Sequence, residues 1–290
     1  MSETRKSEVA TVETKTALEG IPAGGHSRRA AAVATARRLR LRTWLPPLIA
    51  FAGVALAWEL YATAHPFAIP TIERIVDNLN ASPQLYWSNF LTTLREIAVG
   101  GGGGIAVAFL LAILMAELPI AESALMPLFV VLMVTPLIAI APAFVLAFGY
   151  GVLPKYLVTG VVVFYPMLVN TLAGLRDVDP RAFDVFTTLH ASRLETFWRL
   201  RLPSSLPFIF AGLKIALPLS IVGATIAEFV ASGTQAGLGS LIEVAAQQAN
   251  ISVIWASTLL LCLLGIVFVT LLAVIRAKLV WWDKAGQKRT

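Results

Sequence analysis

The stretch that decides the fold of this chain is RDVDPRAFDVFTTLHASRLETFWRLRLPSSLP, residues 176–207. It is polar and basic, and it lies between two apolar segments that are each long enough to cross a lipid bilayer. A charged, helix-forming insert in that position lies at a membrane surface rather than within the hydrocarbon. It is therefore a segment that another protein can bind from the aqueous side.

The composition indicates an integral membrane protein. Of 290 residues, 57% are hydrophobic and 14% are charged, and the mean hydropathy is +0.77. Soluble domains carry about 25% charged residues. A bilayer core of roughly 30 Å needs about 20 helical residues. Apolar runs of that length predict an all-α protein with six transmembrane helices, at Trp44–Thr63, Ile97–Ala116, Ala124–Phe148, Val152–Leu175, Phe208–Ala231 and Ile251–Ile275.

The distribution of Lys and Arg predicts the orientation. Nineteen of the 23 basic residues lie in residues 1–42, 176–201 and 276–289. Cytoplasmic loops carry the excess of basic residues, so both termini and the loop 176–204 are expected in the cytoplasm. Arg74, Arg95 and Lys155 lie in or beside the alternate loops. The net charge of +6 is thus a topology signal, and no nucleic-acid partner is expected because the basic residues form no single patch with interleaved aromatics.

The ends of the chain differ from its middle. Residues 1–42 are polar and basic with no apolar segment near the N-terminus, which predicts a partly disordered cytosolic tail and no signal peptide. Residues 28–42 fit either a basic helix on the lipid surface or a solvated flank that fixes topology. The transmembrane domain then covers residues 43–282, and residues 283–290 form a second cytosolic tail. One cysteine, Cys262, and three scattered histidines predict neither a disulfide nor a metal site.

Two features follow the first predicted span. The outer loop Ala64–Leu94 contains a short amphipathic helix from Thr71 to Leu79, and Tyr86 and Trp87 are expected at the membrane interface. The five glycines of residues 100–104 precede no Gly-Lys-Ser/Thr sequence and have apolar flanks, so a phosphate-binding loop is not expected. They predict close packing of membrane helices.

Polar and proline residues within the spans are candidates for a transport path. Four prolines lie in apolar runs and are expected to kink their helices: Pro136, Pro142, Pro166 and Pro218. Each kink is expected either to line a cavity or only to shape the helix bundle. Each polar side chain within a span is expected either to face the transport path or to form a hydrogen bond with a neighbouring helix. Glu228 either gates the outer mouth or is an acid at the end of its helix. The path candidates are Thr135, Asn170, Ser220, Thr225 and Glu228.

The loop itself predicts two short helices. Asp179 and Pro180 suit the start of a helix, and Ser192 with Glu195 forms a capping box that starts a second one. Pro203 and Pro207 are expected to end the second helix before the next span. The loop also carries exposed apolar residues, which suit a hydrophobic groove on a partner. Alternatively, these residues pack on each other and on the membrane face.

The spacing of this loop resembles that of permease subunits of ABC importers. Those subunits carry Glu-Ala-Ala, three residues, Gly, nine residues and then Ile-x-Leu-Pro. Asp184-Val185-Phe186 stands here for Glu-Ala-Ala, His190 for the glycine and Leu200 for the isoleucine, with every spacing kept. The likeness covers roughly residues 44–282, and Gly212-Leu-Lys214 and Ala227-Glu228 also look like the fifth helix of that family.

The resemblance implies a type I ABC importer permease fold with a cytosolic coupling helix, in the inner membrane of a prokaryote. It implies four kinds of partner: two ABC ATPase subunits, a second copy of the permease, an extracytoplasmic binding protein and membrane lipid. ATP and magnesium would then be held by the ATPase, with no cofactor, metal or catalytic residue on this chain. The residues implied in coupling are Phe183, Asp184, Phe186, His190, Ala191, Ser192 and Glu195.

Within that family the chain looks most like permeases for nitrate, sulfonates, taurine and bicarbonate. Residues 164–171, Gly237-Leu-Gly239 and the pair Trp281-Trp282 are similar to members assigned to pyrimidine thiamine precursors or riboflavin. A small polar solute delivered by a binding protein is thus the expected cargo. The alternative is a secondary transporter or channel that works alone, which predicts internal repeats that the sequence does not display.

Overall fold

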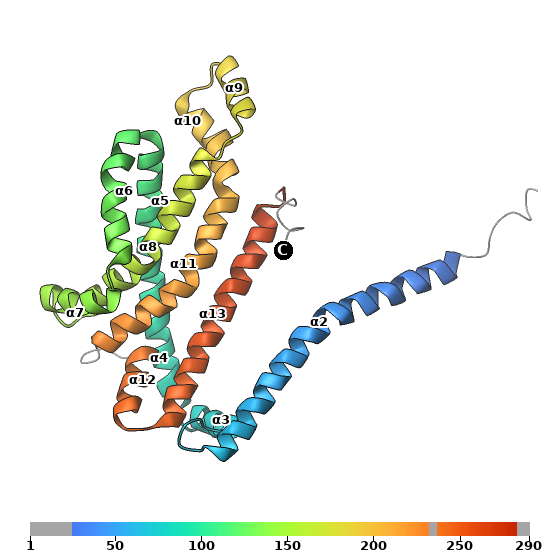
Figure 1. Cartoon of the computed structure of the whole chain (residues 1–290), viewed down its shortest axis with the longest axis vertical. Coiled ribbons are helices and arrows are strands. Elements are labelled where there is room, and N and C mark those ends of the chain that lie inside the picture. Colours follow the sequence, from blue (N-terminus) through green and yellow to red (C-terminus); the bar gives the residue numbers. More distant parts are fainter. Residues whose placement is uncertain (1–24, 232–236, 283–290) are drawn as a thin grey trace, which may run out of the picture. The chain divides into compact units, whose positions relative to one another are not determined.

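The structure is a computed structural model that describes residues 25–231 and 237–282, with side chains from residue 45 onward. Every regular element in these ranges is helical (Figure 1). The chain divides into two compact units, residues 1–61 and 62–290. The first unit contains most of helix α2, Gly25–Ala64, whose apolar part from Leu45 onward is long enough to cross a membrane. Helix is thus present from residue 25, and the disorder expected for the N-terminal tail otherwise falls on residues outside those described.

The second unit holds the remaining helices. Five helical segments of the described chain are long and apolar enough to span a membrane, and there are six if one bent pair counts as a span. The expected all-α fold with six spans is confirmed at this level. The elements are α3 Ile72–Ala81, α4 Pro83–Glu96, η1 Ile97–Gly101, α5 Gly102–Glu117, α6 Pro119–Val134, α7 Leu137–Phe148, α8 Val152–Arg176, α9 Pro180–Thr188, α10 Arg193–Thr196, η2 Phe197–Arg201, α11 Leu202–Val230, α12 Leu238–Gln247 and α13 Ile251–Leu279.

The third predicted span is not one straight helix. Helices α6 and α7 meet at an angle of 101°, with the break at Thr135 and Pro136. A proline lacks a backbone N–H and disfavours the helical conformation in the residue before it. Thr135 accordingly has an extended ψ of 126°. The kink expected at Pro136 is therefore a sharp corner, because the preceding residue leaves the helix as well.

The second span begins earlier than the apolar run does. Helix α4 starts at Pro83 and continues through η1 into α5, which gives a helical segment of 35 residues. The predicted outer loop Ala64–Leu94 is therefore largely helical, and α3 within it confirms the expected amphipathic helix. Tyr86 is buried and donates its hydroxyl hydrogen to Asn78, whereas Trp87 is exposed and stacks on Phe90 with ring centroids 5.7 Å apart.

Helix α8 lies at the centre of the second unit, between α5 and α11 (Figure 1). Glycines allow the close approach on both sides. A Cβ at Gly100 would lie 2.6 Å from the Tyr156 carbonyl oxygen, and one at Gly223 would lie 3.1 Å from the Thr159 Cα. Gly104 faces the Gly160 backbone even more closely. The expected role of the glycine run in helix packing is thus confirmed for Gly100 and Gly104, whereas Gly102 and Gly103 face open space.

The expectation that Pro203 and Pro207 end a helix is wrong. The backbone runs from α10 through the π-helical turn η2 into α11, and both prolines lie inside the resulting helical segment of 38 residues. A proline removes one hydrogen bond from a helix but does not have to end it. The π turn immediately before Pro203 absorbs the irregularity, since the Leu202 N–H already bonds five residues back, to the Phe197 carbonyl.

Candidate coupling loop and buried charge cluster

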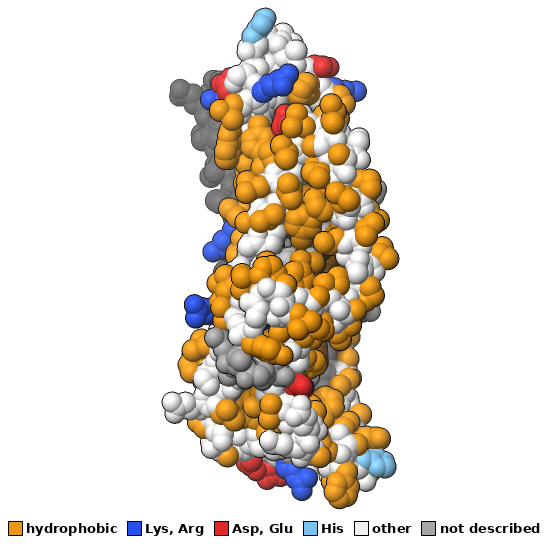
Figure 2. All heavy atoms as spheres, turned by 90° about the vertical axis from the view of Figure 1, so that its left-hand side faces the viewer, with side chains coloured by type: hydrophobic (Ala, Val, Ile, Leu, Met, Phe, Trp, Pro, Cys, Tyr) orange, Lys and Arg blue, Asp and Glu red, His pale blue; other side chains and the backbone are white. Residues whose placement is uncertain are grey.

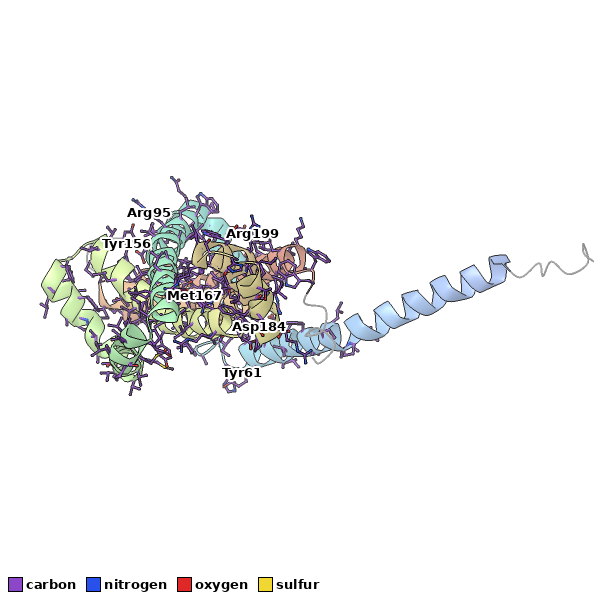
Figure 3. All side chains as sticks on the ribbon, turned by 90° about the horizontal axis from the view of Figure 1, so that it is seen from above. Tyr61, Arg95, Tyr156, Met167, Asp184 and Arg199 are labelled. Carbon is purple, nitrogen blue, oxygen red and sulfur yellow. The ribbon has the colours of Figure 1, made fainter. Side chains whose placement is uncertain are left out.

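The coupling loop, residues 177–201, joins the end of α8 to the start of α11. Helices α9 and α10 lie beyond the ends of these two long helices, on the same side of the second unit as the turn between α5 and α6 (Figure 1). Figure 3 looks onto this end, and the labelled Asp184 and Arg199 belong to the loop that lies across it. Any force applied to the loop therefore acts directly on two neighbouring spans, α8 and α11.

Helix α9 has a defined start and a defined end. The Asp179 side chain accepts a hydrogen bond of 2.9 Å from the Arg181 N–H, which caps the N-terminus as predicted. At the C-terminus, the Ala191 N–H bonds the Phe186 carbonyl and the His190 N–H bonds the Thr187 carbonyl, each at 3.0 Å. This pair of bonds is the Schellman motif.

His190 is the residue that makes this turn. Its φ is 53°, the left-handed conformation that a Schellman motif requires and that glycine adopts most easily. Histidine tolerates this region better than most residues. His190 thus closes the turn in a conformation that glycine adopts most easily.

The second helix begins with the predicted capping box. The Ser192 hydroxyl accepts the Glu195 N–H at 3.2 Å, and the Glu195 carboxylate accepts the Ser192 N–H at 3.3 Å. Helix α10 is only four residues long, because η2 follows it at Phe197. The cap therefore fixes the direction in which the loop re-enters the long helix.

The loop exposes an unusual amount of apolar surface. Phe183 is 44% exposed, Trp198 59% and Leu194 67%, whereas Phe186 is half-buried. Phe197 packs edge-on against Trp198 with ring centroids 5.6 Å apart, so part of the aromatic surface serves the loop itself. Asp184 and Phe183 line a small cavity of 210 Å³.

The five path candidates do not converge on one cavity. The side chains of four of them donate hydrogen bonds within their own helix, to carbonyls three or four residues back: Thr135 to Val131, Asn170 to Pro166, Ser220 to Leu217 and Thr225 to Ile221. Self-bonding of this kind leaves less hydrogen-bonding capacity for a passing solute. Glu228 differs from the others, because its carboxylate bonds groups from other elements.

Glu228 is fully buried near the end of α11, in a cluster that joins four elements. Its carboxylate accepts the Thr93 hydroxyl hydrogen at 2.6 Å, and it accepts the Gly239 N–H. The Thr93 oxygen in turn accepts the Leu238 N–H at 2.9 Å. Glu228 and Thr93 thereby cap the N-terminus of α12, where a negative charge is favourable.

Lys155 and Glu96 complete this cluster, and neither was predicted as a site residue from the sequence. The Lys155 ammonium lies 3.0 Å from a Glu96 carboxylate oxygen, and both side chains are almost fully buried. Glu228 lies close enough to both groups to interact with them electrostatically. The sequence predicts Lys155 in or beside an outer loop, and the structure places it in the first turn of α8 with its side chain buried. The sequence feature that could have indicated this pair is the position of Glu96 and Lys155 directly at the ends of apolar segments.

Two glycines make room for the buried carboxylate. A Cβ at Gly239 would lie 2.6 Å from a Glu228 carboxylate oxygen, and one at Gly237 would overlap that carboxylate. The Gly237-Leu-Gly239 sequence therefore has a local physical reason, which is the close approach of α12 to Glu228. This charge cluster, Thr93, Glu96, Lys155 and Glu228, ties α12 to α4, α8 and α11.

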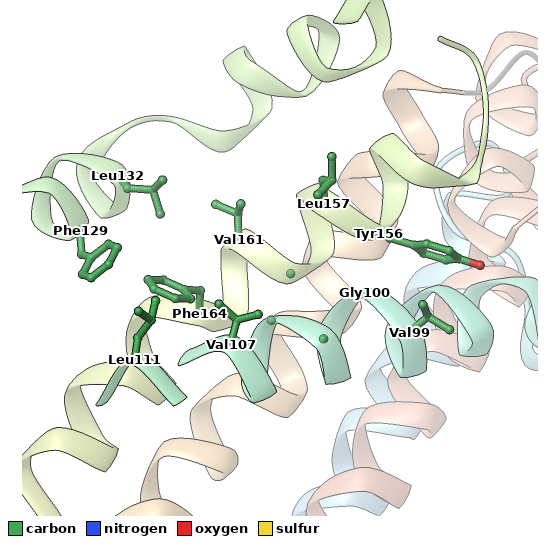
Figure 4. Close-up of a pocket in the computed structure, with 13 residues that line it drawn as sticks. Val99, Gly100, Val107, Leu111, Phe129, Leu132, Tyr156, Leu157, Val161 and Phe164 are labelled. Carbon is green, nitrogen blue, oxygen red and sulfur yellow. The ribbon is translucent and has the colours of Figure 1, made fainter. Parts of the chain in front are cut away.

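An apolar groove of 490 Å³ lies between α5, α6 and α8 (Figure 4). Gly100, Gly103 and Gly104 form one wall, and larger side chains such as Phe129, Leu132 and Phe164 form the others. None of the five path candidates lines it. The face of the second unit that carries α6 and α7 is mostly hydrophobic along its middle, with most of its visible charges near the two ends (Figure 2).

Five or six apolar helices long enough to cross a bilayer, with a polar helical loop beyond their ends, are the features of a multi-pass membrane protein. Residues 104–280 match the family described as the binding-protein-dependent transport system inner membrane component, and the chain belongs to that family. It is a transport permease of the inner membrane rather than an enzyme.

Individual relatives carry the names of permeases for several solutes. The chain is 34% identical to the formylaminopyrimidine transport permease protein of Halalkalibacterium halodurans, over 77% of this chain and 89% of the relative. It is 25% identical to the putative aliphatic sulfonates transport permease protein of Bacillus subtilis, over 82% and 88%. It is 28% identical to the bicarbonate transport system permease protein of Synechocystis sp., over 72% and 79%.

Proposed function

We propose that this chain is the permease subunit of an ATP-driven ABC importer, and that the coupling loop receives the motion of the ATPase. The observation that carries the proposal is the construction of the loop. The loop is capped at both helix starts, is closed by a Schellman turn and connects two long spans, and Phe183, Leu194 and Trp198 on it are exposed. Exposed aromatics on a well-defined helical loop suit a groove on a partner protein.

ATP hydrolysis then takes place on a separate subunit. The 290 residues contain no Gly-x4-Gly-Lys-Ser/Thr sequence, which is the phosphate-binding loop of such ATPases. Closure of two ATPase subunits would displace the coupling loops of two permease copies. Because the loop continues into α8 and α11, the displacement passes to the spans as near-rigid motion and opens the path to each side in turn.

Two copies of this chain would enclose one path about a two-fold axis. Supporting this arrangement, the apolar groove between α5, α6 and α8 opens at the side of the chain, and Gly102 and Gly103 have no neighbouring atoms within 4 Å of an added Cβ. Small residues on a membrane helix permit the close approach of another helix. The path would therefore run along surfaces that a single copy leaves open.

The proposed cargo is a small polar solute delivered by an extracytoplasmic binding protein. The names of the relatives span a formylaminopyrimidine, riboflavin, aliphatic sulfonates and bicarbonate. The higher identity to the formylaminopyrimidine permease favours a pyrimidine or a related vitamin precursor among these. Calorimetric titration of the cognate binding protein with one member of each class tests the choice directly.

The competing proposal is a secondary transporter or channel that works alone. Purification of the tagged chain in mild detergent separates the two proposals, since a permease should bring down a subunit that hydrolyses ATP. The variant Phe186→Ala should reduce this association while membrane insertion stays normal. Phe67→Ala is the matched control, because Phe67 is 91% exposed and lies outside the coupling loop. Equal recovery of the ATPase from both variants would remove Phe186 from the interface.

The orientation is tested by labelling from outside intact cells in a Cys262→Ser background. A cysteine at Ser82, between α3 and α4, should react, and one at Arg193 in the coupling loop should not. Reaction at position 193 would place the coupling loop outside, where no ATPase could reach it.

A further inference from the structure

The turn between α5 and α6 carries two isolated charges. In the 58 residues from 97 to 154, Glu117 and Glu122 are the only charged side chains. Glu117 is the last residue of α5, and Glu122 lies in the first turn of α6. Charged residues in such an apolar hairpin are costly unless they are solvated or paired, so their partners are informative.

Both acids are paired with arginines at the two ends of the coupling loop. Glu122 forms an ion pair with Arg176, the last residue of α8, and Glu117 forms one with Arg201, the last residue of η2. Arg176 also donates a hydrogen bond of 3.3 Å to the Met115 carbonyl. That carbonyl belongs to the last turn of α5, where cations are favourable.

Helix α6 has few other attachments to the second unit. It contains no buried residue in the described structure. Met126 and Phe129 pack against the core, and the rings of Phe129 and Phe164 pack edge to face with their centroids 4.9 Å apart. Phe129 and Leu132 of α6 also form one wall of the apolar groove. The position of that wall therefore depends strongly on how the cytosolic end of α6 is held.

We propose that Arg176, Arg201, Glu117 and Glu122 form a clamp that makes the α5–α6 turn move with the coupling loop. Each arginine holds one end of the loop against the same turn, so displacement of the loop carries the turn along and keeps the α6 wall of the groove with α8. The four residues act as positioning residues. The clamp itself is a property of this chain, and only its use in transport rests on the proposed function.

The alternative to a clamp is that each of the four side chains is solvated independently at the membrane surface. Their side chains are between 23% and 40% exposed, and isolated ion pairs of this kind contribute little. In the clamp, both ion pairs converge on the α5–α6 turn, and Arg176 also bonds the C-terminus of α5. They form a network in which breaking one ion pair weakens the other. Exchange of the charges distinguishes a network from four independently solvated groups.

The first experiment measures the clamp in the full-length chain in lipid nanodiscs, with Cys262→Ser. Spin labels at Ile120→Cys and Leu194→Cys, both at exposed positions, report the distance between the turn and the loop. We expect one narrow distance distribution. Glu117→Arg or Glu122→Arg should raise the population of separated conformations roughly fivefold, and the exchanged pairs E117R/R201E and E122R/R176E should restore the narrow distribution.

The control is Glu73→Arg, which makes the same charge change at an exposed position in α3. It should leave the distribution unchanged. If the single reversals also leave it unchanged, or if the exchanged pairs stay as broad as the single reversals, the clamp does not exist.

The second experiment uses the complex with the co-purified ATPase, trapped with ADP and vanadate. A third label at Val274→Cys in α13 serves as a reference. The distances from Ile120 and from Leu194 to this reference should change together, while the distance from Ile120 to Leu194 stays constant. Movement of Leu194 alone would overturn the clamp. If neither position moves, the proposed coupling function fails, and the nanodisc result alone decides the clamp.

Discussion

The two charged regions of this permease, the cluster around Glu228 and the clamp around Arg176 and Arg201, differ in burial. The charge cluster around Glu228 is almost fully buried, and its groups are held by bonds from four elements. The clamp around Arg176 and Arg201 is partly exposed, and its partners come from a single turn. A buried charge cannot lose its partner cheaply, whereas an exposed pair exchanges protein contacts for water. The first region is thus suited to fixing a structure and the second to moving as a unit.

Each region also adjoins a π-helical turn. Glu96 directly precedes η1, and Arg201 is the last residue of η2. A π turn inserts one extra residue into a helix and rotates the side chains that follow it, and such turns are frequent at functional sites. The two turns therefore separate the charged positions from the regular apolar faces of α5 and α11. Substitutions in the buried cluster should therefore have larger effects on stability than substitutions in the exposed coupling loop.

Lys155→Met should have the largest effect. It removes the only cation of the cluster and leaves the buried carboxyl groups of Glu96 and Glu228 facing each other. Breaking a buried ion pair in this way costs about 3–5 kcal/mol. The midpoint of thermal unfolding in nanodiscs should fall sharply. Lys214→Met is the matched control, since Lys214 is exposed in α11 and should change stability little.

A second substitution shows whether the stability lost in Lys155→Met comes from the missing charge or from changed packing. Adding Glu96→Gln to Lys155→Met removes one of the two facing carboxylates and should recover part of the lost stability. No recovery would mean that packing around the lysine chain, rather than its charge, holds the cluster together.

Gly239→Ala should have the next largest effect. The new methyl group would lie 2.6 Å from a Glu228 carboxylate oxygen and 3.0 Å from the Thr225 carbonyl. Overpacking of a tight site costs about 1–3 kcal/mol. Gly53→Ala is the control, because nothing lies within 4 Å of its added Cβ, and alanine is favoured over glycine inside a helix such as α2 by about 0.5–1 kcal/mol. Equal unfolding midpoints for the two variants would contradict the close fit of α12 on Glu228.

Glu228→Gln separates the structural role of this acid from a role in transport. The amide oxygen still accepts the Thr93 hydroxyl hydrogen, but the amide NH2 group cannot accept the Gly239 N–H, and the charge at the N-terminus of α12 is lost. Removal of that favourable charge costs up to about 2 kcal/mol, which relief of repulsion with Glu96 offsets in part. We expect an intact complex with lower uptake of the bound solute. Uptake at the wild-type rate would leave Glu228 with the structural role alone.

Glu195→Ala should have the smallest effect. It removes half of the capping box in the coupling loop, which costs about 1 kcal/mol of local helix stability. Uptake should fall only slightly, because η2 continues α10 into the long helix α11. Hydrogen exchange of the amides at 193–196 reports the loss directly. A loss of uptake as large as that caused by Glu228→Gln would mean that transport is as sensitive to this cap as to the buried cluster.

Local signals were read correctly where they act over a few residues. The cap at Asp179 and the capping box at Ser192 and Glu195 depend on side chains that bond backbone groups two or three positions away, and both are present. The spans follow from the length of the apolar runs, although Thr135 and Pro136 break the third one. The roles of the coupling residues in binding an ATPase, and of the five path candidates in transport, stay predictions.

Length, hydropathy and short-range spacing by themselves determined the membrane class, the approximate spans and the two-helix coupling loop, because each depends on neighbours along the chain. Only the tertiary structure decided the partners of the charged residues. Glu96 and Lys155 are 59 positions apart, Thr93 and Glu228 are 135 apart, and Glu117 and Arg201 are 84 apart. Helix packing brings these groups together, and for the buried Glu96 and Lys155 the cost of an unpaired charge in an apolar bundle makes the pairing specific.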